Sequence, residues 1–176
     1  SERFKNLNSQ NQLAFKKRKK ILFVLCGIKN IDIELLKLAM EVCLLKKDLK
    51  IFIKPHPILD LNDIVPSRDL PKNLVILYED LNKILKRSLI CITAGPSSAL
   101  LESAYHGAYN ILPEVECGAE ENLKIFNLNK SNFSVVQNSE ELLNKIIFIM
   151  KNKGRIKIKK IKNLNSKSKK ISSLLN

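Results

Sequence analysis

Tryptophan is absent from the 176-residue sequence, and aromatic residues make up only 6% of it. The core must therefore consist mostly of Leu, Ile and Val, and the hydrophobic content of 45% is ordinary for a globular domain. No apolar run approaches the roughly 18 residues that a membrane-spanning helix needs, and no signal-peptide pattern is present. We expect one folded domain in the cytoplasm. Because the chain opens with Ser and not with Met, we also expect it to be part of a longer protein.

The cysteines lack a motif, since Cys26, Cys43, Cys91 and Cys117 show no Cys-x-x-Cys spacing. A metal site and a disulfide pair are the functional alternatives. The first three cysteines lie inside apolar runs, however, and cysteine often serves as a small buried hydrophobic residue in a reducing compartment. The sequence therefore predicts buried free thiols.

Positive charge is abundant, with a formal net charge of +14. Much of it lies in two runs, at 16–20 and 153–170. Such runs bind nucleic acid, anionic lipid headgroups or another polyanion, but they are equally well explained as solvated ends of a Lys-rich chain. No RNA-binding aromatic signature or basic recognition helix accompanies them. We expect no specific nucleic-acid binding, and we expect peripheral contact with an anionic inner membrane face through the basic tail.

Short apolar runs alternate with segments of helical spacing along most of the chain. Strands are predicted at 21–26, 49–54, 73–78, 88–93, 109–113 and 133–136, and helices at 32–47, 79–87, 98–106 and 140–152, with a further helix near 119–126. This alternation predicts an α/β fold, a Rossmann-like doubly wound and mainly parallel six-stranded sheet with helices on both faces. The predicted domain spans 20–152, between an N-terminal linker or arm at 1–19 and a basic C-terminal tail at 153–176.

A histidine lies between two prolines in Lys54-Pro55-His56-Pro57, directly after a predicted strand. The prolines restrict the backbone on both sides of the imidazole. A rigid imidazole at the carboxyl end of a strand can donate a hydrogen bond to a phosphate oxygen, and Lys54 adds positive charge beside it. The alternative is a loop histidine that merely follows a strand.

A second strand ends in Thr93-Ala-Gly-Pro-Ser-Ser98. Gly95 allows a sharp turn or a close approach of the backbone to a ligand. Ser97 or Ser98 is a natural N-cap, and a helix N-terminus with free N–H groups binds anions. The alternative is a plain capped helix. The P-loop signature GxxxxGK[ST] and the motif GxGxxG are both absent, so ATP hydrolysis has no support.

Glu102 follows Ser98 by one helical turn and lies on the same face. Its carboxylate is placed to accept hydrogen bonds from ribose hydroxyls, although a solvated helix carboxylate is the default for any glutamate. Gly107 is expected to end this helix in a left-handed cap, with His106 as a cation at the helix end.

One predicted strand is followed by KPHP and another by TAGPSSALLESAYHGAYNILP. Together, these two segments resemble the C-terminal, donor-binding half of GT-B glycosyltransferases. The His-Pro pair followed by a Ser-Ser pair is similar to bacterial sialyltransferases and polysialyltransferases, and to capsule transferases that use CMP-Kdo. The pattern S-x-x-x-E-x-x-x-x-G is similar to the wider superfamily, including UDP-GlcNAc 2-epimerases. The resemblance covers roughly residues 20–150.

The resemblance implies a function and roles for several residues. The chain would be the donor half of a metal-independent transferase for bacterial surface polysaccharide, with a CMP-sugar (sialic acid or Kdo-like) as its donor substrate and no separate cofactor. His56 would bind the donor phosphate and stabilise the leaving nucleotide, together with Lys54, Gly95, Ser97 and Ser98. Glu102 would hold the ribose. A missing N-terminal domain would bind the glycan or glycolipid acceptor and supply the general base.

Other candidates are weaker. The Asp60-Leu-Asn-Asp63 segment is the nearest approach to an Asp-x-Asp metal motif, and we interpret it as a loop. An acidic cluster follows the fifth predicted strand, and it is either a solvated loop or a contact to the sugar; its members are Glu114, Glu116, Glu120 and Glu121. Two alternative functions are a relative of UDP-sugar epimerases or hydrolases and a non-enzymatic domain that binds partners through its basic ends.

Overall fold

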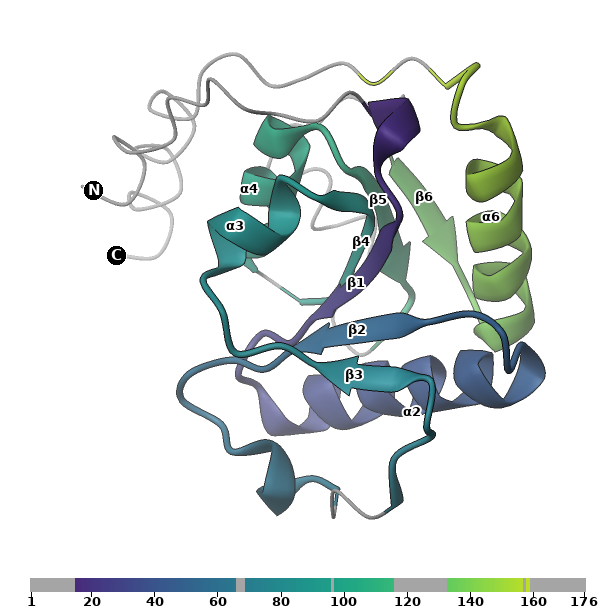
Figure 1. Cartoon of the computed structure of the whole chain (residues 1–176). Coiled ribbons are helices and arrows are strands. Elements are labelled where there is room, and N and C mark those ends of the chain that lie inside the picture. The colour runs from purple at the N-terminus through teal and green to yellow at the C-terminus, as the bar shows by residue number, and fades with distance from the viewer. Residues whose placement is uncertain (1–14, 66–68, 96, 116–132, 157, 159–176) are drawn as a thin grey trace.

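The structure, a computed structural model, describes residues 15–65, 69–95, 97–115, 133–156 and 158. A six-stranded sheet with the order β3-β2-β1-β4-β5-β6 forms its centre, and every neighbouring pair of strands is parallel (Figure 1). The strands are β1 (Lys20–Val24), β2 (Ile51–Lys54), β3 (Leu74–Ile76), β4 (Ser88–Thr93), β5 (Tyr109–Pro113) and β6 (Phe133–Val136). The predicted Rossmann-like, doubly wound α/β fold is confirmed.

Helices cover both faces of the sheet (Figure 1). On one face, α2 (Lys29–Leu45) and α6 (Ser139–Asn152) pack against alternate residues of the central strands, such as Ile21 and Phe23. On the other face, α3 (Leu81–Leu85) and α4 (Ser98–His106) pack against the intervening residues, such as Leu22 and Val24. Two short 3-10 turns, Phe15–Lys17 and Leu61–Asp63, complete the described elements. Strand residues buried on both faces explain the continuous apolar runs in the sequence.

The ends of the helices depend on specific side chains. Asn138 caps α6 by accepting the backbone N–H of Glu141, whose carboxylate in turn accepts the N–H of Gln137, the residue before the cap. Gly107 ends α4 with φ of 70° and ψ of 35°, the predicted left-handed cap. The start of α2 differs from the prediction by three residues, because Asp32 lies inside the first turn and its side chain is used elsewhere. The helix predicted near 119–126 lies outside the described residues.

Arg18, within the segment predicted to be a linker or arm, is only 2% exposed. Its Nη1 donates to the carbonyl oxygen of Ser88 over 3.1 Å, and its Nη2 donates to that of His106 over 2.6 Å. Burial lowers the pKa of the Arg18 guanidinium. The basic run at 16–20 is therefore not uniformly solvated, since its central arginine connects the chain before β1 to the start of β4 and the end of α4.

The three described cysteines are free thiols. Cys43 and Cys91 are buried, as predicted, and burial raises their pKa values to about 11 and about 12. Cys26, after β1, is only partly buried, yet loss of solvation raises its pKa to about 11 as well. Cys117 lies outside the described residues. Among the described residues, no helix combines the length and the apolar character that crossing a bilayer requires.

Replacing Arg18 by methionine is expected to lower the free energy of unfolding by about 2 kcal/mol, because two buried carbonyl groups lose a charged donor. Urea denaturation followed by circular dichroism measures this change. Lys17→Met is the matched control, since Lys17 is exposed and its loss should change stability by less than about 0.5 kcal/mol. Equal losses for the two variants would contradict a structural role for Arg18.

Thiol reactivity is expected to report the raised pKa of Cys26. In a Cys117→Ser chain, the reaction of Cys26 with a disulfide reagent at pH 8 should be about tenfold slower than that of an unstructured thiol, because a roughly 100-fold smaller thiolate fraction is partly offset by higher intrinsic nucleophilicity. The rate should keep rising up to about pH 11. A rate that levels off near pH 9 would show that the thiol has its ordinary pKa.

Candidate functional site

The predicted site residues follow the carboxyl ends of β2 and β4. In a parallel sheet these ends share one edge, and the switch point of this strand order lies between β1 and β4, where the chain turns to opposite faces. The loop after β1 therefore lies between the loop that carries His56 and the loop that carries Gly95. This edge is where a ligand is expected in a sheet of this topology.

Gly27, in the loop after β1, is in contact with the ring of His56. A Cβ added at Gly27 would lie 2.6 Å from Nδ1 and 2.9 Å from Cγ of the imidazole, and the backbone φ is 87°. Both the space and the conformation demand glycine here. The sequence prediction missed this residue, although a glycine directly after a buried strand was the available signal.

Gly95 makes a similar approach on the other side of the same loop. Its φ is 68°, and an added Cβ would lie 3.0 Å from Cδ1 of Ile31 and 3.5 Å from Sγ of Cys26. The loop Cys26–Gly27 is thus packed against the loop after β2 through its glycine and against the loop after β4 through its cysteine. The structure places the three loops in contact along one edge of the sheet.

Asp32 holds the central loop in place. It is fully buried, and its Oδ1 and Oδ2 accept the backbone N–H groups of Cys26 and Gly27 over 2.7 and 2.8 Å. Hydrogen bonds from backbone N–H groups to a carboxylate are strong, and two of them fix both the peptide plane and the direction of the loop. The sequence prediction began a helix at Asp32 and assigned this residue no other role.

The imidazole of His56 is partly exposed and has a defined tautomer. The backbone N–H of Ile58 donates to Nδ1 over 3.3 Å, so the proton of the neutral ring is on Nε2. Pro55 is buried beneath it, and Lys54, also partly exposed, donates from Nζ to the carbonyl of Pro55 over 3.3 Å. The site therefore presents an Nε2–H donor with a lysine two residues away in the sequence.

The two serines at the start of α4 have different hydrogen bonds. Ser97 is the N-cap, and its Oγ accepts the N–H of Ala99 over 3.3 Å. Ser98 is exposed, and its Oγ donates to Oε1 of Glu102 over 3.2 Å. A hydroxyl group has a single proton. No described residue accepts the proton of Ser97, whereas the proton of Ser98 is already used. Pro96 lies outside the described residues.

Glu102 shares a face of α4 with Ser98, as the spacing predicted, but it has no exposed surface. The Oε1 atom of its carboxylate already accepts the hydroxyl of Ser98. His106 is buried and lies away from this edge, with Nε2 at 3.1 Å from Oδ1 of Asn82, so that it joins α4 to α3.

The remaining candidates show no converging geometry. Asp60 caps the short turn that follows His56 by accepting the N–H of Asn62, which supports its interpretation as a loop residue. Glu114 is exposed after β5, and Glu116, Glu120 and Glu121 lie outside the described residues. No group of three described His, Cys, Asp or Glu side chains is arranged to hold a metal ion.

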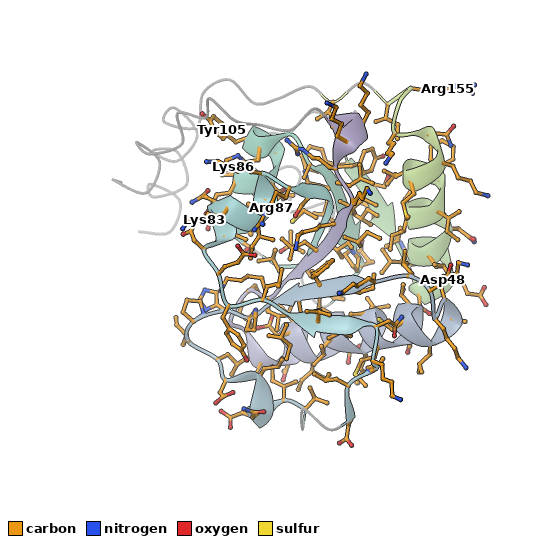
Figure 2. All side chains as sticks on the ribbon, in the orientation of Figure 1. Asp48, Lys83, Lys86, Arg87, Tyr105 and Arg155 are labelled. Carbon is orange, nitrogen blue, oxygen red and sulfur yellow. The ribbon has the colours of Figure 1, made fainter. Side chains whose placement is uncertain are left out.

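Charged and apolar side chains occupy different parts of this surface. Lys83, Lys86 and Arg87 gather around α3, and Arg87 is paired with Glu79 over 2.5 Å (Figure 2). Two large exposed apolar residues instead follow the carboxyl ends of β2 and β3, namely Ile58 at 82% and Tyr78 at 77% exposure. The edge that carries His56 therefore offers apolar surface next to hydrogen-bond donors, a combination typical of ligand sites.

No family model and no curated protein matches the chain. Several solved structures share its fold. The glycotransferase of kitacinnamycin superposes on 96% of this chain with a TM-score of 0.53 and 12% identity. CalG4, the calicheamicin glycosyltransferase, covers 88% with a TM-score of 0.55 and 16% identity. TarM covers 83% with a TM-score of 0.56 and 15% identity.

This chain spans 41%, 38% and 30% of those three chains, respectively. It therefore matches one part of each larger molecule. At these low identities the likeness concerns the fold, and it identifies the six-stranded sheet as an architecture that glycosyltransferase structures contain.

Proposed function

We propose that the chain is the donor-nucleotide-binding part of a GT-B glycosyltransferase for bacterial surface polysaccharide, with a CMP-sugar as donor. One observation carries this proposal. His56 and Ser97 come from two loops that pack against the same central loop, and each offers a proton that no described residue accepts. Two such donors at the carboxyl edge of a parallel sheet, one of them at a helix N-terminus, are suited to a phosphate group.

The chemistry requires donors directed at developing negative charge. During transfer, the bond between the anomeric carbon and the phosphate oxygen breaks, a bond to the acceptor oxygen forms, and the negative charge grows on the departing phosphate. The Nε2–H of His56 and the hydroxyl of Ser97 stabilise that charge, with the dipole of α4 behind Ser97, and Lys54 adds a positive charge nearby. The acceptor proton leaves to a base outside this chain, and none of these groups needs a metal ion.

The rest of the donor is assigned from the same edge. The exposed apolar surface of Ile58 and Tyr78 is available to the base. We assign the ribose to Glu102, whose carboxylate would accept a ribose hydroxyl in addition to the hydroxyl of Ser98. The proposed acceptor is a glycan or glycolipid bound by a second domain, and the basic tail is proposed to contact anionic lipid at the inner membrane face.

Titration of the chain with CMP, UDP and their sugars tests the donor site. We expect CMP to bind and His56→Ala to raise its dissociation constant by about 10- to 100-fold, because a hydrogen bond to a charged group is lost. His106→Gln is the control at the second histidine, which lies away from the site. Absence of nucleotide binding would refute the proposal, and turnover of a sugar nucleotide without an acceptor would favour an epimerase or hydrolase.

The two serines are expected to differ in the same titration. Ser97→Ala should weaken CMP binding by about tenfold, because its proton is available to the phosphate. Ser98→Ala should change the dissociation constant by less than about threefold, because the Ser98 proton is donated to Glu102. A larger effect for Ser98→Ala would reverse this assignment. Thermal unfolding of both variants separates loss of binding from loss of the N-cap, which by itself costs about 1 kcal/mol.

A further inference from the structure

The carboxylate of Asp32, which lies in the first turn of α2, binds the loop that follows β1. In many Rossmann-like proteins the backbone N–H groups of that loop bind a phosphate. Here the N–H groups of Cys26 and Gly27 are already bound, over 2.7 and 2.8 Å, by the carboxylate of the chain itself. These two N–H groups are therefore already occupied, and a phosphate at this end of the sheet would need donors from the loops after β2 and β4, where His56 and Ser97 lie.

The bound loop is also in contact with the imidazole. Gly27 is held with φ of 87°, and its Cα lies so close to His56 that a methyl group would overlap Nδ1. At the same ring atom, the N–H of Ile58 donates to Nδ1 over 3.3 Å. The ring is thus confined on its Nδ1 side by the glycine and by the N–H of Ile58, and Nε2 has no hydrogen-bond partner among the described residues.

We infer that Asp32 is a positioning residue for His56: by fixing the Cys26–Gly27 loop, it holds the imidazole in the orientation and tautomer that donate from Nε2 to the donor phosphate. The inference rests on the proposed donor site for its functional consequence. Its structural part, the effect of Asp32 on the ring of His56, holds with or without a ligand.

The substitution Asp32→Asn tests this directly with little change in shape. The amide oxygen still accepts one N–H, but the amide NH2 group faces the other N–H, so one of the two hydrogen bonds is lost. We then expect the Cys26–Gly27 loop to move and to stop confining the imidazole of His56. Glu34→Gln is the matched control, because Glu34 is an exposed carboxylate on the same helix, paired with Lys37.

The first measurement is nitrogen-15 NMR of the histidine rings without ligand. In the wild-type chain, His56 should show the Nε2–H tautomer, and in Asp32→Asn its two nitrogen shifts should move toward the average of both tautomers. Buried His106, the only other histidine, serves as an internal reference and should not change. A His56 spectrum identical to wild type in Asp32→Asn would overturn the inference.

The second measurement is a double-mutant cycle on CMP binding, with variants in Asp32 and His56. Asp32→Asn should raise the dissociation constant about tenfold in the wild-type background. In the His56→Ala background it should have almost no further effect. An equal effect in both backgrounds would show that Asp32 acts only through general stability and would overturn the inference.

The two proposals fail in distinguishable ways. If the wild-type chain binds no CMP, the donor function is refuted, while the NMR comparison still decides whether Asp32 positions His56. If Asp32→Asn does not fold, Gly27→Ala replaces it, because the added Cβ at 2.6 Å from Nδ1 displaces the same ring. Retention of the wild-type His56 tautomer in folded Gly27→Ala would equally overturn the inference.

Discussion

The pair of hydrogen bonds from Cys26 and Gly27 to the carboxylate of Asp32 is the interaction on which the geometry of the site depends. It joins the first strand to the first helix and fixes the loop between them. That loop is central along the edge and contacts the loops on both sides, at His56 through Gly27 and at Gly95 through Cys26. A buried carboxylate is costly unless it is well bound, and two short hydrogen bonds from backbone N–H groups meet that requirement.

The parallel sheet supplies the second constraint. All six strands run in one direction, so that every loop with an unusual sequence emerges at the same edge. At the other, amino-terminal end of β4, Arg18 binds the carbonyl groups of Ser88 and His106. Arg18 and the candidate site thus lie at opposite ends of the central strands.

The candidate site residues differ in whether their protons are already donated to another described residue. His56 and Ser97 each accept one hydrogen bond from the backbone and have a proton that no described residue accepts, whereas Ser98 donates its proton to a carboxylate. A loop with fixed donors requires little reorganisation when charge develops on a ligand, which is the physical basis of electrostatic stabilisation in enzymes. The glycosyltransferase structures that share the fold use a longer chain, of which this domain corresponds to less than half.

By itself, the sequence determined the fold class, the strand pattern and the left-handed cap at Gly107, because these depend on periodicity and on local backbone chemistry. It also indicated His56, Ser97 and Ser98 as candidate site residues, because prolines and a glycine accompany them near the ends of predicted strands. Only the tertiary structure decided that Asp32 turns back to bind the preceding loop, that Gly27 contacts the ring of His56, that Arg18 is buried and that Glu102 has no exposed surface. Each of these depends on which segments pack together in three dimensions, and a residue's own neighbours in the sequence carry no record of such contacts.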